Sequence, residues 1–124
     1  MYQFHNPNPK NFFTDDCNIR AVAVAFNMTW DEAYVDLTTE GYILKDNPNS
    51  KRVVNSYLKG KGWIRKVIPN TCPNCYTVKD FVKDNPYGTY ILATENHLIP
   101  VINGIYYDIF DSGMESPIYY WERD

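Results

Sequence analysis

Three residue types that together form a thiol-based catalytic site occur in two distant parts of this chain. Cys17 follows two aspartates and precedes an apolar run, which is typical of a thiol in the first turn of a buried helix. His97 and Asp108 lie far downstream, within a segment whose pattern predicts a β-hairpin. A cysteine nucleophile, a histidine base and a carboxylate that orients the histidine are the components of acyl-transfer catalysis. These three residues are therefore the candidate catalytic residues.

The register of the predicted hairpin decides which carboxylate can reach the histidine. Asn103-Gly104 is the strongest two-residue hairpin signal. If these residues form the turn, His97 lies opposite Phe110, and Asp108 is diagonal to His97 on the same face of the sheet. The same register places Asp111 on the other face, whereas a bulge at the turn would reverse the choice. We therefore expect Asp108 to orient the imidazole.

The residues around Cys17 bear on how its thiol is activated. The start of a helix favours an anion, because its backbone N–H groups are free and the helix dipole is positive there. Asp15 and Asp16 oppose thiolate formation, and their expected role is to cap the helix. Activation therefore requires His97. The Cys17 N–H and the side chain of Asn11, six residues upstream, are the candidate donors to the oxyanion.

Helical patterns dominate the first half of the chain and strand patterns the second half. Residues 1–13 are polar and interrupted by proline, which predicts an extended arm. Helices are predicted at about 15–26, from a capping box at 29–32, from Ser50 to Gly60, and at 77–82. Strands are predicted at 63–68, 88–94, 98–102, 105–110 and 118–121. This order predicts an α+β fold, with residues 1–124 forming a single domain.

Composition narrows the classes of function. The chain has 124 residues with 44% hydrophobic residues, enough for a packed core. A net charge of −3 with scattered basic residues argues against nucleic-acid binding, and no apolar run reaches membrane-spanning length. The N-terminal residues lack a signal-peptide pattern, so we expect a cytoplasmic protein with reduced cysteines. Nothing in the sequence indicates a cofactor.

Two further features have alternative interpretations. Cys72-Pro73-Asn74-Cys75 has half the spacing of a zinc site, but no second ligand pair accompanies it. Its surroundings favour a loop with two thiols that form a disulfide on oxidation, and they disfavour a metal site or a redox-active pair. Arg20 is placed to cover the site, or to pair with Asp16 or Glu32, and the sequence does not choose among these roles.

The motifs together resemble the papain-like cysteine peptidase superfamily. The resemblance lies in Asp16–Ala21 at a helix start, in Trp30-Asp31-Glu32 opening the next helix, and in His97 followed by the turn to Tyr107-Asp108. Short members from bacteriophages and Gram-positive bacteria, similar to the peptidases that process bacteriocin leader peptides, are the most alike. The resemblance implies N-terminal helices packed on a C-terminal antiparallel sheet, with the thiol facing the histidine across a cleft. The superfamily's oxyanion glutamine is replaced here by Asn11.

Three functions are compatible with these residues. The first is a cysteine hydrolase that cleaves a peptide, isopeptide or amide bond in a protein or peptide substrate. The second is a catalytically silent binding module on the same fold, which would sequester a host protein or a small ligand. The third is transglutaminase-like acyl transfer to an amine, which uses the same residues and differs only in its products.

Overall fold

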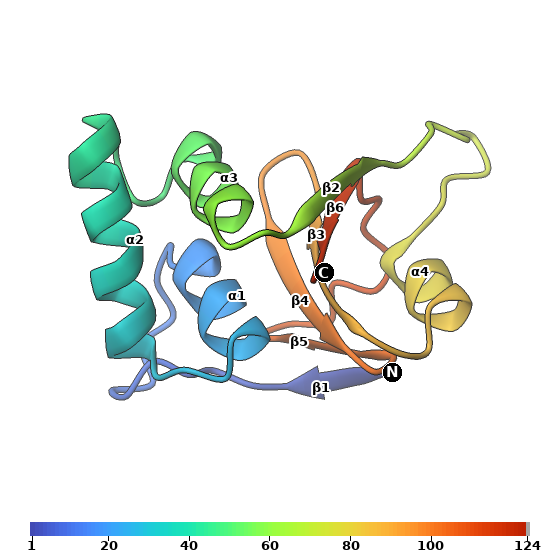
Figure 1. Cartoon of the computed structure of the whole chain (residues 1–124). Coiled ribbons are helices and arrows are strands. Elements are labelled where there is room, and N and C mark those ends of the chain that lie inside the picture. The colour runs from blue at the N-terminus through green and yellow to red at the C-terminus, as the bar shows by residue number, and fades with distance from the viewer. Residues whose placement is uncertain (124) are drawn as a thin grey trace.

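The computed structural model describes residues 1–123, which form an α+β fold with four helices and one mixed sheet (Figure 1). The helices are α1 (Cys17–Ala25), α2 (Trp30–Leu44), α3 (Lys51–Gly60) and α4 (Val78–Asp84). The strands are β1 (Tyr2–Phe4), β2 (Ile64–Val67), β3 (Thr89–Ala93), β4 (Leu98–Ile102), β5 (Ile105–Asp108) and β6 (Tyr119–Glu122). Their order across the sheet is β1-β5-β4-β3-β6-β2.

Side-chain caps explain where three of the helices begin. Thr29 accepts a hydrogen bond from the Glu32 N–H at 3.1 Å, and the Glu32 carboxylate accepts one from the Thr29 N–H at 2.9 Å, which confirms the predicted capping box. Ser50 caps α3 as predicted, and Thr77 caps α4. Helix α1 is the exception, because Asp16 at its N-cap makes no side-chain capping bond.

The two faces of the sheet are covered by different helices. Helices α1 and α3 cover one face, with α2 packed on their outer side, and α4 lies on the opposite side of the sheet (Figure 1). Along β3 the side chains alternate between these layers, because Ile91 and Ala93 pack with the first three helices whereas Leu92 packs with α4. Helix α1 packs directly against β4 and β3, so its first turn is held close to the start of β4.

The β4–β5 hairpin has the predicted register. Ile102 pairs with Ile105 and Val101 pairs with Tyr106 across the Asn103-Gly104 turn. Both turn residues have positive φ, 49° and 77°, as a tight two-residue turn requires. Strand β5 ends earlier than predicted, at Asp108 instead of residue 110.

The C-terminal strands pair antiparallel as predicted, but the sheet is mixed, because an N-terminal strand joins it in parallel. Strand β1 pairs with β5, so that Tyr2 lies beside Tyr106 and Phe4 lies beside Asp108. The His5 N–H extends this contact by donating to the Asp108 carbonyl at 3.0 Å. The first residues were predicted to be an extended arm, with no strand assigned to them. A three-residue strand carries no periodic signal, and its pairing depends on the free edge of β5.

Candidate active site

Cys17 is the first residue of α1 and is half-buried. Asp16, immediately before it, was predicted to cap the helix but turns its carboxylate elsewhere. Its Oδ1 accepts from Arg20 Nε at 2.7 Å and its Oδ2 accepts from Trp30 Nε1 at 2.9 Å. The first-turn N–H groups of α1 therefore receive no acceptor from the N-cap side chain, and free N–H groups of this kind favour an anion beside Cys17.

The hairpin brings His97 and Asp108 together. His97 immediately precedes β4, Asp108 is the last residue of β5, and His97 Nε2 lies 2.7 Å from Asp108 Oδ2. The side chain of Phe110 stacks on the imidazole, with ring centroids 5.2 Å apart. Both neighbours of His97, the carboxylate of Asp108 and the ring of Phe110, are the ones that the predicted register places there. Asp111 is engaged separately, because its Oδ1 accepts hydrogen bonds from the Tyr106 hydroxyl and the Gly113 N–H.

Asp108 is held on all sides by hydrogen-bond donors. Its side chain is 1% exposed, and besides His97 it accepts from the Ile109 N–H at 2.8 Å, Ser112 Oγ at 2.8 Å and Arg20 Nη1 at 3.1 Å. The bond to the Ile109 N–H occupies a group that would otherwise be free to continue the strand, which accounts for the early end of β5. A carboxylate with several donors is fixed in orientation and kept ionised.

The electrostatics of the pair favour a charged imidazole. Burial opposes protonation of His97, but hydrogen bonds with Asp108 and Cys17 outweigh it and raise the pKa of His97 to about 9. Burial likewise opposes ionisation of Asp108, and the bonds from His97, Ser112 and Ile109 hold the pKa of Asp108 below its usual value. Because Nε2 is engaged by Asp108, Nδ1 is the ring nitrogen left for the Cys17 thiol.

Arg20 contacts two carboxylates, of which the sequence predicted only one as a possible partner. Of the predicted alternatives, it pairs with Asp16, through the i,i+4 spacing that a helix surface favours. The same guanidinium also reaches Asp108, 88 residues further along the chain. Arg20 is 7% exposed, so this pairing lies inside the protein. Only the Asp16 contact had a local signal, because the contact with Asp108 depends on how α1 packs against the hairpin.

The structure does not bring Asn11 into this network. Asn11 lies in an exposed turn before α1, with φ of 58°, and its N–H donates to the Asn8 carbonyl at 2.9 Å. Within residues 1–123 its side chain makes no hydrogen bond. Asn8 in the same turn is buried, and its side-chain oxygen accepts from the Lys10 N–H. The predicted oxyanion donor is therefore solvent-exposed in this structure.

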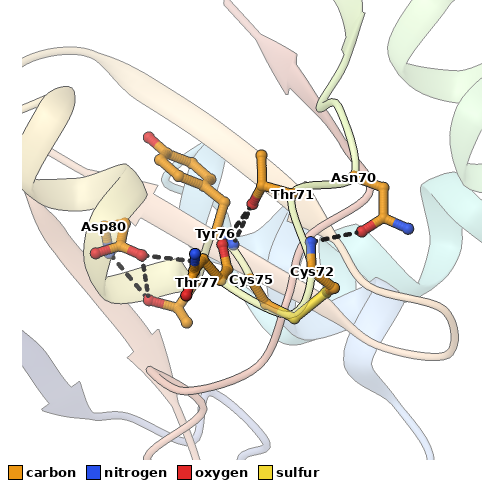
Figure 2. The surroundings of a disulfide bond; sticks show 8 residues. Asn70, Thr71, Cys72, Cys75, Tyr76, Thr77 and Asp80 are labelled. Carbon is orange, nitrogen blue, oxygen red and sulfur yellow. Dashed lines mark hydrogen bonds between the residues drawn. A yellow bond between two sulfur atoms is a disulfide. The ribbon is translucent and has the colours of Figure 1, made fainter.

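Cys72 and Cys75 form a disulfide in the loop between β2 and α4 (Figure 2). The expectation of reduced cysteines therefore does not describe this pair, and Cys17 is the free thiol. The loop is organised by its own polar groups. Thr71 Oγ1 donates to the Asn74 carbonyl at 2.7 Å, and Figure 2 shows the Cys72 N–H donating to the side chain of Asn70. Across residues 1–123, no group of three or more His, Cys, Asp or Glu side chains is arranged to bind a metal.

A cavity of about 290 Å³ lies beneath the disulfide loop. Its walls include apolar side chains from both ends of the loop region and from the segment before β6, together with Glu95 of the β3–β4 turn: Ile68, Pro69, Tyr76, Glu95, Pro117, Ile118. Glu95 is two residues before His97. The cavity and the Cys17–His97 pair therefore lie at the same end of the sheet.

Hydrogen bonds from the start of α3 connect α1 with the rim of this cavity. The side chain of Asn18 donates to the carbonyls of Pro48 and Ser50 at 3.2 and 3.1 Å. Lys51 follows Ser50, and its Nζ donates to the Glu95 carbonyl at the rim of the cavity. The start of α3 thus connects the thiol to the turn that carries His97.

Comparison with family models, curated proteins and solved structures finds no match to this chain. None of the helices in residues 1–123 is long and apolar enough to cross a membrane.

Proposed function

We propose that this protein is a cysteine hydrolase with a papain-like arrangement, which cleaves a peptide, isopeptide or amide bond. One observation carries the proposal: the His97 ring is held by a buried carboxylate at 2.7 Å, and the Cys17 thiol at the start of α1 is near enough to raise the pKa of the same ring. The thiol itself lies 3.7 Å from Asn18 Oδ1, to which it donates. The remaining histidine, His5, is exposed and has no comparable carboxylate partner among the hydrogen bonds of residues 1–123. A half-buried thiol, an imidazole and a buried carboxylate are the groups that a cysteine nucleophile requires.

In the proposed reaction, His97 holds the proton of the Cys17 thiol as an imidazolium before attack, and the thiolate Sγ attacks the substrate carbonyl carbon. The negative charge that forms on the carbonyl oxygen is stabilised by the first-turn N–H groups of α1, which the N-cap side chain leaves free. The carbon–nitrogen bond then breaks, and His97 returns the proton to the departing amine. Water, deprotonated by His97, hydrolyses the thioester and regenerates the thiol. Asp108 keeps Nε2 engaged throughout, so that Nδ1 faces the reacting atoms.

The cavity beneath the disulfide loop supports a polypeptide substrate over a small amide. Strands are spaced by about 4.8 Å, and the cavity lies near the ends of β3 and β6, so its centre is on the order of 10–15 Å from His97. An extended peptide spans this distance in about three or four residues. A substrate that reaches both places is therefore a chain, with an apolar side chain in the cavity.

The test is the pH dependence of Cys17 alkylation by iodoacetamide, followed by mass spectrometry of the modified peptide. We expect alkylation well below pH 8 in the wild type and loss of that reactivity in His97→Ala. The matched control is His5→Ala, which removes the exposed histidine and should leave the profile unchanged. A Cys72→Ser/Cys75→Ser variant ensures that only one thiol is measured.

A profile typical of free cysteine, unchanged in His97→Ala, would refute the proposal and favour the binding module. If the profile is as expected, peptide mixtures are then incubated with the wild type and with Cys17→Ala, and new termini are identified by mass spectrometry. New termini that depend on Cys17 establish hydrolysis.

A further inference from the structure

We infer that Arg20 is a positioning residue for the proposed reaction, which cancels the charge of Asp16 beside the nucleophile and fixes the carboxylate that orients His97. Its guanidinium bridges the two acids, with Nε 2.7 Å from Asp16 Oδ1 and Nη1 3.1 Å from Asp108 Oδ1. All three side chains are at most 9% exposed. This inference rests on the proposed function, because it assigns a role within the same site.

The location of Asp16 makes its charge important. Asp16 is the N-cap residue of α1 and directly precedes Cys17, so an uncompensated carboxylate there would oppose thiolate formation. The N-cap position would normally direct that carboxylate onto the first-turn N–H groups. Arg20 and Trp30 hold it on the other side instead, which leaves those N–H groups free for an anion. Arg20 thus neutralises the Asp16 carboxylate, and by binding it also keeps that carboxylate from accepting the first-turn N–H groups.

The second contact links the helix to the hairpin. Arg20 approaches Asp108 at Oδ1, whereas His97 binds Oδ2, so the two partners do not compete for one oxygen. Because Arg20 belongs to α1, the same side chain relates the position of Cys17 to that of Asp108. A buried ion network of this kind contributes little net stability compared with apolar side chains of equal volume. Its effect should therefore be sought in the reactivity of the thiol.

Other charged and titratable groups lie near the site but differ from Arg20 in their contacts. Asp15 is exposed, Asp111 is engaged by Tyr106 and Gly113, Tyr2 donates to the Asp108 backbone carbonyl, and Lys51 donates to the Glu95 carbonyl. The His5 N–H is bound to that same Asp108 carbonyl. None of these contacts involves the Asp16 carboxylate.

The experiment compares the pH midpoint of Cys17 alkylation in four variants, each checked for folding by near-ultraviolet circular dichroism. Arg20→Met should raise the midpoint by about one pH unit, because it removes a cation and exposes the charge of Asp16 to the thiol. Asp16→Asn should lower the midpoint by a similar amount, because it removes the negative charge beside Cys17 and leaves the positive charge of Arg20 balanced by Asp108 alone. The double variant removes both charges and should return close to the wild type. Arg20→Lys retains the charge and should also stay close to it.

Opposite shifts in the two single variants are the decisive result, because a purely structural role would move both midpoints in the same direction or not at all. If Arg20→Met does not fold, Asp16→Asn and the double variant still give the comparison. Lys66→Met, which breaks an exposed ion pair with Glu122, is the control for charge removal and should leave the midpoint unchanged. A His97-dependent wild-type profile with no opposite shifts overturns the role of Arg20 alone. A wild-type profile independent of His97 overturns the proposed function itself.

Discussion

The raised pKa of His97 predicts that the stability of the fold depends on pH in a specific window. The folded protein binds the imidazole proton more tightly than the unfolded chain, with pKa values of about 9 and 6.5. The stability that the protonated His97 adds to the folded state is therefore fully present below pH 6.5 and is lost as the pH rises through about 9. The perturbation is His97→Gln, which preserves hydrogen bonding but removes the titration.

The size of this loss of stability follows from the difference between the pKa of His97 in the folded and the unfolded protein. A difference of about 2.5 pKa units corresponds to at most about 3.4 kcal/mol. Because the His97 ring retains some contact with solvent, screening reduces this value, and we expect about 1–2 kcal/mol. The wild type should lose this much more stability than His97→Gln between pH 6 and pH 10.

The assay is urea unfolding at a series of pH values, followed by the fluorescence of the tryptophans, of which Trp63 and Trp121 are buried. Comparing the two proteins removes the contributions of titrating groups that do not interact with His97, and leaves those of His97 and its partners. A Cys17→Ala variant should show a smaller loss than the wild type, because the thiol is one of the partners that raise the pKa of His97. Parallel curves for the wild type and His97→Gln would refute the assignment of a buried, charge-stabilised imidazole.

Three further predictions concern the surroundings of the pair. Asp108→Asn should lower the rate of the proposed peptide cleavage by about 10²–10⁴-fold, because His97, no longer held in orientation, loses its contribution as the general acid and base, while Asp111→Asn leaves kcat unchanged; equal losses would contradict the predicted register. Ser112→Ala should cost about 1–2 kcal/mol in urea unfolding, since it removes one buried donor to a carboxylate, and an unchanged midpoint would mean that this bond contributes nothing. Replacing Cys72 and Cys75 by serine should lower the free energy of unfolding by at most about 2 kcal/mol, because the disulfide closes a short loop. The pH profile of Cys17 alkylation should stay unchanged, and loss of that profile would instead connect the disulfide to the site.

Local signals accounted for much of the fold and for the central pair of the site. The Asn103-Gly104 turn determined the register, and the register alone placed Asp108 beside His97. Capping residues such as Thr29 and Ser50 located two helix starts correctly, because a cap is a contact within four residues of sequence.

The features that the sequence did not predict depend on long-range packing. Strand β1 forms only because β5 offers it an edge, and Arg20 reaches Asp108 only because α1 lies against the hairpin. Asp16 was assigned to the helix cap on local grounds, but the buried Arg20 and the half-buried Trp30 donate to its carboxylate instead. No local rule distinguishes a capping aspartate from one that is bound by a distant tryptophan.

The parallel pairing of β1 with β5 has a consequence for the timing of assembly. Ribosomal synthesis proceeds from the N-terminus, so Cys17 and Arg20 are made well before Asp108, which Arg20 contacts across 88 residues. Strand β1 must also wait for β5 before it has any partner within the sheet. Contacts between such distant segments form slowly, since a long loop has to close first. The nascent chain therefore carries the Cys17 thiol without an oriented imidazole until residue 108 has been made, and the proposed site forms only as a late event in the folding of these residues.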